Sequence, residues 1–397
     1  MKLTVVIVSY NVRSYLVQCL RSLAKALDGT DSEIYVVDNH SKDDTVEYLS
    51  SHFPEVQLVA SPHNLGFARA NNLAIRKSAS EYVLLLNPDT VVAERTVREA
   101  LDFMDAHPDA GALGVRMLDV TGASARESRR GLPSPMVAFY KMTGLCARFP
   151  KHPRLGHYYM GDLPWESPAR IEVVSGAFCM LRREALDKVG CLDEDFFMYG
   201  EDIDLSYRIL KGGYHNYYLP SLILHYKGES TQKSSFRYVH VFYEAMLIFF
   251  KKHYSGMSLL LSLPVKVAIY AKAFLALVRM QMDKARKSLG FVTYDWREPL
   301  YVFVGTGKML EAARTIARKK GLTAEFVSCG KTECGEHLLK YNGSSEEKAI
   351  RYLVFDMAEF AYEDVFKLFM SNHDKKTRMA FFHLDSGILV TEREILG

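Results

Sequence analysis

Short apolar runs alternate with helical patterns through the first hundred residues of the chain. Strands are expected at residues 3–8, 33–37, 56–59 and 82–86. Helices are expected between them at residues 12–27, 43–52 and 68–78. The first helix repeats leucine at spacings of three and four, and Ser41 followed by Asp44 predicts a capping box for the second. Strands separated by helices predict an α/β fold with a doubly wound, mostly parallel sheet.

Polar residues that favour turns gather where these four strands end. The residues that follow the strands are Ser9, Tyr10, Asn11, Asp38, Asn64, Gly66, Asn87 and Asp89. Ligands of doubly wound sheets bind in the crevice beyond the carboxyl ends of the strands. Ordinary loops have a similar composition, but carboxylates directly after buried strands, as at Asp38 and Asp89, favour a binding site.

The next part of the chain is less regular. Residues 110–170 mix arginines and lysines with glycines and prolines, which predicts a long mobile region. A strand is expected after it within residues 171–181, followed by a helix at 183–189. Glu201 and Asp202 then head a further helix, in which Asp202 is either a helix cap or a functional acid.

Six ordered stretches of the chain carry a resemblance to a known family. They are VVIVSYN, VVDNHSKDDT, HNLGFARANN, LLLNPDT, VVSGAFCMLRREAL and FFMYGEDIDLSYRILKGG, with His225 downstream. Residues 1–256 therefore resemble the inverting family-2 glycosyltransferases of the GT-A fold, close to their rhamnosyltransferase-like branch. The resemblance implies transfer of a sugar from a UDP- or dTDP-sugar to a hydroxyl of a glycan or polyprenyl-diphosphate-linked acceptor. The expected pathway is bacterial surface polysaccharide synthesis.

The chemistry of this reaction asks for a base and a compensating cation. Inversion is a single displacement, so one base takes the proton of the acceptor hydroxyl. By resemblance that base is Asp202, with Glu201 as the alternative. A leaving diphosphate is compensated by Mg²⁺ or Mn²⁺, which prefer carboxylate oxygen. Asp89 is the expected ligand, and His225 resembles a histidine that completes metal binding in some relatives; its alternative is a structural role.

The resemblance also implies contacts to the donor and acceptor. Asp38 corresponds to the residue that accepts from the imide N–H of uracil or thymine, although it is also suited to an Asx turn. The expected nucleotide-sugar contacts are Ser9, Tyr10, Asn11, Asp38, Asn64, Gly66, Asn72 and Asn87. Asn72 is equally suited to a helix surface. Gly176 and Ala177 leave room for the sugar and acceptor, or pack tightly at a strand end.

Composition and charge narrow the class of protein. The chain is 48% hydrophobic and 24% charged, which excludes disordered and disulfide-stapled classes, and its net charge of +3 does not indicate nucleic-acid binding. Six scattered cysteines predict free thiols in a reducing compartment, and the apolar start reads as a first strand rather than a signal peptide. The expected location is the cytoplasm, at the inner face of the cell membrane.

Residues 251–290 carry eight Lys and Arg against one Asp. The nearly continuous apolar run within them, at 259–278, is interrupted by a proline and two lysines. This pattern favours an amphipathic helix in the interface of an anionic membrane over a full span. The alternative is a helix buried against the catalytic domain.

An α/β pattern restarts near residue 299 and resembles a small Rossmann-like domain. Its glycine motif is incomplete, which favours a scaffold role over dinucleotide binding. The expected division is 1–256 for the GT-A domain, 257–298 for the helical linker and 299–397 for the Rossmann-like domain. Two rival functions remain: a nucleotidyltransferase, for which the first strand lacks a glycine-rich phosphate loop, and a nucleotide-sugar-binding scaffold without turnover.

Overall fold

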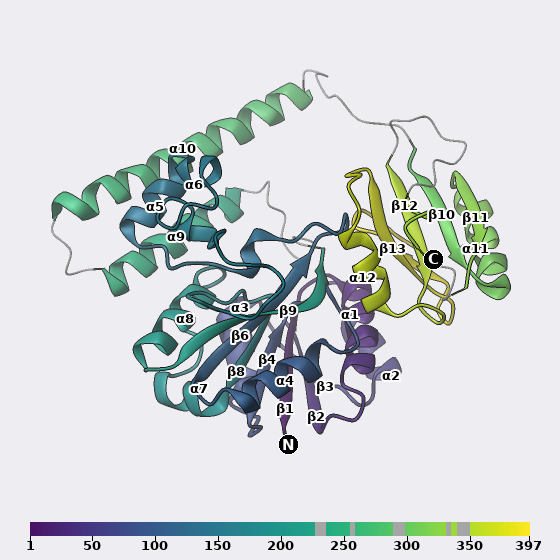
Figure 1. The fold of residues 1–397 in the computed structure, drawn as a ribbon, viewed down its shortest axis with the longest axis horizontal. Helices are drawn as coiled ribbons and strands as arrows, with labels where there is room; N and C mark the ends of the chain where they lie inside the picture. The colour runs from purple at the N-terminus through teal and green to yellow at the C-terminus, as the bar shows by residue number, and fades with distance from the viewer. Residues whose placement is uncertain (227–235, 255–258, 289–297, 331–334, 340–349) are drawn as a thin grey trace.

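The computed structural model describes residues 1–226, 236–254, 259–288, 298–330, 335–339 and 350–397. Figure 1 shows a larger α/β unit built on one sheet, a smaller α/β unit built on a second sheet, and a group of helices over one end of the larger sheet. The predicted fold class, a mostly parallel GT-A-type sheet with a second smaller sheet, is confirmed.

The first sheet is parallel where the sequence predicts it. Its strands are β1 (Leu3–Ser9), β2 (Ser32–Asp38), β3 (Gln57–Ala60), β4 (Tyr82–Leu86), β5 (Thr90–Val92), β6 (Ala110–Leu118), β7 (Ala169–Ile171), β8 (Phe178–Arg182) and β9 (His215–His225). The order is β3-β2-β1-β4-β8-β6-β9-β5, with β7 paired to β9. The first four strands run parallel, whereas β8 is antiparallel to both of its neighbours. The carboxyl ends of β1, β2 and β4 therefore meet at one edge.

The helices of this unit cover both faces of the sheet. They are α1 (Arg13–Ala26), α2 (Thr45–His52), α3 (Gly66–Ile75), α4 (Thr96–Ala106), α7 (Arg183–Val189) and α8 (Glu201–Lys211). The leucine repeat of α1 is buried, as its spacing predicts. The capping box is wrong: Asp44 is the N-cap of α2 without a side-chain cap, because the Ser41 hydroxyl instead accepts from the Asn11 N–H.

The expectation of a long mobile region at 110–170 is also wrong. Its first part is β6, which is buried throughout. Glycines conceal this strand from the hydrophobic pattern, because a Cβ at Gly111 would lie 2.5 Å from the Ile209 side chain and one at Gly114 would lie 2.9 Å from Val174. The rest forms the short elements η1 (Arg126–Ser128), α5 (Pro135–Met142), α6 (Leu145–Arg148) and η2 (His157–Tyr159).

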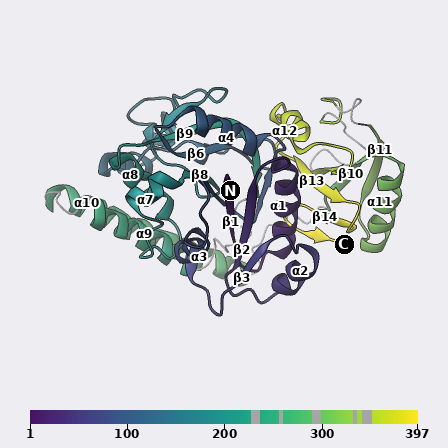
Figure 2. The same cartoon turned by 90° about the horizontal axis from the view of Figure 1, so that it is seen from below.

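Two further helices follow the first sheet. They are α9 (Phe236–His253) and the long α10 (Leu259–Ser288); Figures 1 and 2 show α9 away from the second sheet, and Figure 1 shows α10 running from that side along the top of the molecule. The predicted helix at 259–278 is thus confirmed as a helix. None of the helices, over the residues that the structure describes, is both long and apolar enough to cross a membrane.

The second sheet starts at residue 300. It consists of β10 (Leu300–Gly305), β11 (Ala324–Ser328), β12 (Arg351–Asp356), β13 (Thr377–His383), β14 (Ile388–Val390) and β15 (Ile395–Leu396) in the order β11-β10-β12-β13-β14-β15, with helices α11 (Gly307–Lys320) and α12 (Tyr362–Met370). Its first four strands are parallel, as a Rossmann-like arrangement requires.

The two sheets share a hydrophobic core. One buried cluster joins residues of α1, β5 and β9 to residues of β10, β12 and α12. Hydrogen bonds also join the two units beside this core. The Glu94 carboxylate accepts from the first two N–H groups of α12, and Lys25 donates to the Met357 carbonyl directly after β12. The carboxyl edge of the second sheet, where a Rossmann-like domain binds its ligand, therefore packs against α1.

Candidate active site

A cavity of about 220 Å³ lies beyond the carboxyl ends of β1, β2 and β4. Residues from all the strand-end loops line it: Val8, Tyr10, Asn39, Asn64, Gly66, Phe67, Asn87, Pro88, Ser175, Gly176, Ala177, Phe197, Met198, Tyr199, Glu201, Asp202 and His225. The parallel strands thus gather polar groups where the topology predicts a ligand. We call this the donor cavity.

The loops after β1 and β2 are tied together beside this cavity. The Asn11 side chain accepts from the Lys42 N–H at 2.7 Å, and the Asp38 carboxylate accepts from the Ser41 N–H at 3.0 Å. Asp38 therefore does form an Asx-type turn with one oxygen. Its other oxygen is buried and has no hydrogen-bond partner among the described residues, so it is available to a donor N–H of a ligand.

A second set of hydrogen bonds fixes the loop before α3. Asn39 donates to the Asn64 side chain and to the Gly66 carbonyl, and it accepts from the Leu65 N–H. Gly66 has φ +78°, and a Cβ there would lie 2.4 Å from the Phe197 carbonyl oxygen. Glycine is needed here because the Phe197 loop approaches its backbone, so that both loops can face the cavity.

Asp89 and His225 meet below the donor cavity. Asp89 is 1% exposed, and its Oδ1 lies 3.2 Å from Nε2 of His225, while the Asn87 amide is 3.4 Å from the same nitrogen. Pairing of β5 with the end of β9 brings the two residues together, because Thr90 lies opposite His225. Among the described residues, no cluster of three or more His, Cys, Asp or Glu side chains has the arrangement of a complete metal site.

Glu201 and Asp202, the acids at the start of α8, also line the donor cavity. Asp202 accepts from the Ile203 N–H at 2.8 Å and from Arg130, and the Gly176 N–H lies 3.4 Å away. Glu201 is 6% exposed. Burial, and then the charge of Asp202, raises the pKa of Glu201 to about 8. The raised pKa favours the protonated form of Glu201, which cannot take a further proton, so Asp202 is the better candidate base of the pair.

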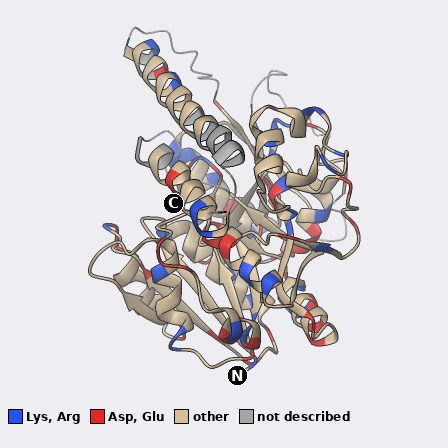
Figure 3. Ribbon diagram, turned by 90° about the vertical axis from the view of Figure 1, so that its left-hand side faces the viewer, with Lys and Arg blue, Asp and Glu red and all other residues tan. Residues whose placement is uncertain are grey.

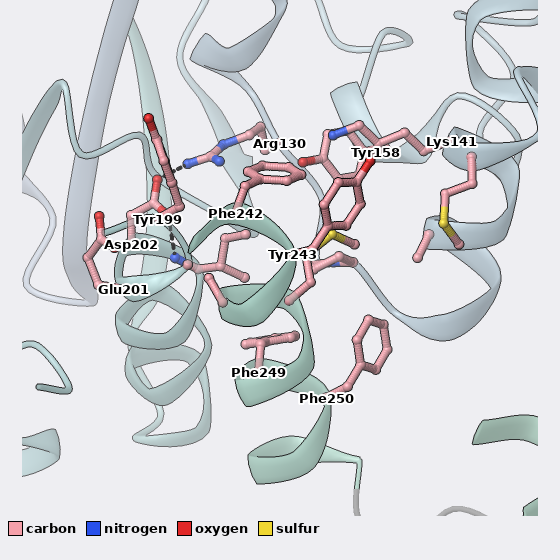
Figure 4. Close-up of a pocket in the computed structure, with 17 residues that line it drawn as sticks. Arg130, Lys141, Tyr158, Tyr199, Glu201, Asp202, Phe242, Tyr243, Phe249 and Phe250 are labelled. Atoms are coloured by element: carbon pink, nitrogen blue, oxygen red, sulfur yellow. Dashed lines mark hydrogen bonds and ion pairs between the residues drawn. The ribbon is translucent and has the colours of Figure 1, made fainter. Parts of the chain in front are cut away.

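A second cavity, of about 310 Å³, lies on the other side of Asp202 (Figure 4). It shares Tyr199, Glu201 and Asp202 with the donor cavity, and its other walls come from α5, α9 and the loop at Arg130. Most of these walls are aromatic or aliphatic side chains. We call it the apolar cavity.

Helix α9 is held over α8 by contacts behind the apolar cavity. His253 lies 2.6 Å from the Asp204 carboxylate, which also pairs with Arg208 as the i, i+4 spacing predicts. Lys252 pairs with Asp193 at 2.5 Å. These contacts hold the wall of the cavity in place relative to Asp202.

The structure brings together most of the predicted site residues. Those that line one or both cavities are Tyr10, Asn64, Gly66, Asn87, Gly176, Ala177, Glu201, Asp202 and His225. Ser9, Asn11, Asp38 and Asp89 lie in the adjoining loops or beneath them. The position of Asn72 does not fit the predicted contact with the donor. Its side chain is fully buried and bonds Leu192 and Glu194, so it ties α3 to the loop that contains these two residues.

Two residues of the site, Asn39 and Arg130, were not predicted from the sequence. Asn39 lies within the stretch VVDNHSKDDT, but its three hydrogen bonds depend on how the loops fold against one another. Arg130 belongs to the segment that was expected to be mobile, and no local pattern indicates its pairing with Asp202, 72 residues away.

Comparison with known proteins shows which family this chain resembles. Residues 4–190 match the profile described as Glycosyl transferase family 2. The chain is 31% identical over 267 residues to the N-acetylglucosaminyl-diphospho-decaprenol L-rhamnosyltransferase of Mycobacterium tuberculosis, covering 64% of this chain and 85% of that protein. It is 23% identical to the rhamnosyltransferase WbbL of Escherichia coli K12, covering 59% and 91%.

Among solved structures, the chain resembles a mannosyltransferase of Pyrobaculum calidifontis in complex with GDP-Man and Mn²⁺. The TM-score is 0.44 at 18% identity, over 74% of this chain and 81% of that one. The family profile covers β1 to β4, whose ends build the donor cavity. The chain therefore belongs to glycosyl transferase family 2 and is a glycosyltransferase.

Proposed function

We propose that this protein is an inverting transferase that moves a sugar from a UDP- or dTDP-sugar to a hydroxyl of a polyprenyl-diphosphate-linked acceptor. The observation that carries the proposal is the position of Asp202 on the wall shared by the donor cavity and the apolar cavity. A base in that position reaches a hydroxyl on one side and faces the anomeric carbon of a donor on the other. The mycobacterial relative is named for a lipid-linked acceptor, which supports the same class here.

Asp202 is the proposed base, and Glu201 is the neutral neighbour. In a single in-line displacement, the bond from the acceptor oxygen to the anomeric carbon forms while the bond to the diphosphate breaks. The hydroxyl proton passes to an Asp202 oxygen. Gly176 supports this arrangement, because a side chain at its Cα would fill space beside the Asp202 Cβ, which lies 3.8 Å from the ideal Cβ position.

Asp89 and His225 are suited to bind a divalent cation. Asp89 supplies a carboxylate and His225 an imidazole, 3.2 Å apart and close to Asn87. Mg²⁺ and Mn²⁺ accept such ligands and take their remaining ligands from phosphate or water. We propose that these two residues hold the cation, which when bound compensates the charge of the leaving diphosphate. Asp38, with its unpartnered buried oxygen, is the proposed acceptor for the imide N–H of the base.

Helix α10 is the proposed contact with the membrane at the inner face of the cell. It exposes one apolar face whose members recur every three or four residues: Val267, Tyr270, Phe274, Val278 and Met282. Arg279 and Arg286 are exposed on the same helix, which Figure 3 shows extending away from the first sheet. An apolar stripe beside basic residues is suited to the surface of an anionic bilayer. This role places the enzyme where a polyprenyl-linked acceptor is anchored.

The boundaries at 256/257 and 298/299 remain our proposed domain division, with residues 299–397 as a scaffold. The packing of α1 against the carboxyl edge of the second sheet favours this role over dinucleotide binding.

The central test uses the full-length protein with a panel of UDP-, dTDP- and GDP-sugars and a short polyprenyl-diphosphate-linked GlcNAc. Asp202→Asn is expected to lower turnover at least about a hundredfold and to keep the thermal stabilisation by the donor, because the amide cannot take a proton. Asp102→Asn, at an exposed position of α4, is the matched control and should keep full activity. Activity of Asp202→Asn within tenfold of wild type would contradict the proposed base.

The cation and membrane proposals have separate readouts. Asp89→Asn should abolish the part of the UDP-dependent thermal stabilisation that requires Mn²⁺, and an unchanged Mn²⁺ dependence would contradict the site. Replacing Phe274 and Val278 by serine should reduce co-sedimentation with vesicles that contain phosphatidylglycerol. Replacement of the exposed Gln281 of the same helix by serine should not.

A further inference from the structure

The apolar cavity has the lining of a site for an apolar ligand. Its aromatic and aliphatic walls come from two helices and include Phe242, Tyr243, Met246, Phe249 and Phe250 of α9 (Figure 4). Helix α5 contributes Ala138 and Met142 from the facing side. A sugar alone has no need of such walls, because its hydroxyl groups would lose water without gaining partners.

The lining of the same cavity includes two cations, Arg130 and Lys141. Lys141 lies with its Nζ 3.5 Å from the centre of the Tyr158 ring. The guanidinium of Arg130 donates to Asp202 and to the Val174 carbonyl, while its buried Nε has no hydrogen-bond partner among the described residues. Arg130 and Lys141 therefore accompany one carboxylate, Asp202, while burial favours the uncharged form of Glu201. An anion is therefore favoured beside the apolar walls.

Hydrogen bonds hold Asp202 at both of its carboxylate oxygens. One of its oxygens accepts from the Ile203 N–H, and the other accepts from Arg130. Both oxygens are thus engaged in this structure. The bond from Arg130 occupies one of the lone-pair sites at which Asp202 could take a proton, and its departure would free that site, whereas the backbone N–H of a helix stays in place.

We propose that the apolar cavity binds the phosphate-bearing end of an isoprenoid acceptor, and that Arg130 moves from Asp202 to the acceptor phosphate and so frees the base. This inference rests on the proposed role of Asp202. A phosphate competes well for Arg130 because guanidinium and phosphate form paired, charge-assisted hydrogen bonds. Lys141 supplies the second positive charge, and the α9 aromatic side chains hold the first isoprene units. Arg130 then links recognition of the acceptor to activation of the hydroxyl.

The test compares three acceptors that carry the same sugar: one joined to farnesyl through diphosphate, one joined to farnesyl through an ether without phosphate, and one methyl diphosphate without the chain. Wild type should prefer the first over each of the others by at least tenfold in kcat/KM. Arg130→Gln should lower kcat/KM for the farnesyl diphosphate acceptor at least thirtyfold and change that for the ether acceptor less than threefold. The preference for the diphosphate acceptor over the ether acceptor would then be lost.

Controls separate this role from a structural one. Arg126→Gln, at an exposed arginine of the same segment, should leave the selectivity unchanged. Lys141→Gln should reduce selectivity for the diphosphate, and Phe249→Ala should reduce it for the farnesyl chain. Equal losses on both acceptors in Arg130→Gln, or wild-type activity that ignores the phosphate, would overturn the inference.

A separate binding measurement keeps this inference apart from the proposed reaction. Farnesyl diphosphate should stabilise the full-length protein against heat, and Arg130→Gln should lose that shift while keeping the shift caused by UDP. If wild type binds farnesyl diphosphate in this way but transfers no sugar, then the proposed reaction fails and the cavity assignment stands. Absence of any Arg130-dependent binding overturns the cavity assignment alone.

Discussion

The charge state of Glu201 offers the most direct test of the electrostatics of the site. Its carboxyl group is buried beside Asp202 at the start of α8, and the pKa is raised to about 8 from 4.5, first by burial and then by the neighbouring negative charge. Glu201→Gln keeps the size of the side chain and removes the titrating group. We therefore expect the variant to differ from wild type in the pH dependence of its stability.

The sign and size of the effect follow from proton linkage. Between pH 4.5 and about 8, the unfolded chain releases the Glu201 proton while the folded protein holds it. Wild-type stability therefore falls as pH rises, by about 1.4 kcal/mol per pH unit from this group. At pH 7 the accumulated cost is on the order of 3 kcal/mol. Glu201→Gln is expected to be more stable than wild type by about this amount at pH 7 and nearly equal to it below pH 4.5.

Urea unfolding of both proteins at several pH values between 4.5 and 8 measures this difference. Glu47→Gln, the same change at an exposed position of α2, is the control and should follow the wild-type curve. If the stabilities of wild type and Glu201→Gln stay parallel over the whole range, the carboxyl is already ionised in the folded protein. The assignment of Asp202 as the anion of the pair would then lose its electrostatic basis.

Three further predictions concern the donor loops and the second sheet. Asp38→Ala should weaken UDP binding by roughly tenfold to a hundredfold, since it removes a charged hydrogen-bond acceptor, and calorimetry with UDP and GDP should show a loss for UDP alone. Asn39→Ala removes three hydrogen bonds between loops and should lower the free energy of unfolding by about 2 kcal/mol in urea titrations, with weaker donor binding. Glu94→Ala uncaps α12 and should cost about 1–2 kcal/mol in the same assay, whereas Glu359→Ala, at an exposed position, should cost little; equal effects of the two would refute the cap.

The sequence by itself determined the parallel core of the first sheet and the ends of its strands. Hydrophobic periodicity is a local property, so the strands from β1 to β4 and the leucine face of α1 follow from residues close together in the chain. The parallel order then fixes the edge where polar loops meet, and for this reason Tyr10, Asn64 and Asn87 could be predicted together. The helix pattern predicted the two acids at the head of α8, and the resemblance to the family singled out Asp202 among them.

Only the tertiary structure decided which of these groups touch. Strand β6 escaped prediction because two of its positions are glycines that admit side chains from α8 and from the loop before β8, a property of packing rather than of pattern. Asn72 was assigned to the donor although its partners lie about 120 residues along the chain, in a loop that sequence spacing cannot bring near it. The pairing of Arg130 with Asp202 and of Asp89 with His225 likewise depends on how distant strands and helices pack. Local preferences select the elements, whereas hydrogen bonds and ion pairs between distant residues form only after the shared core has set the distances between those elements.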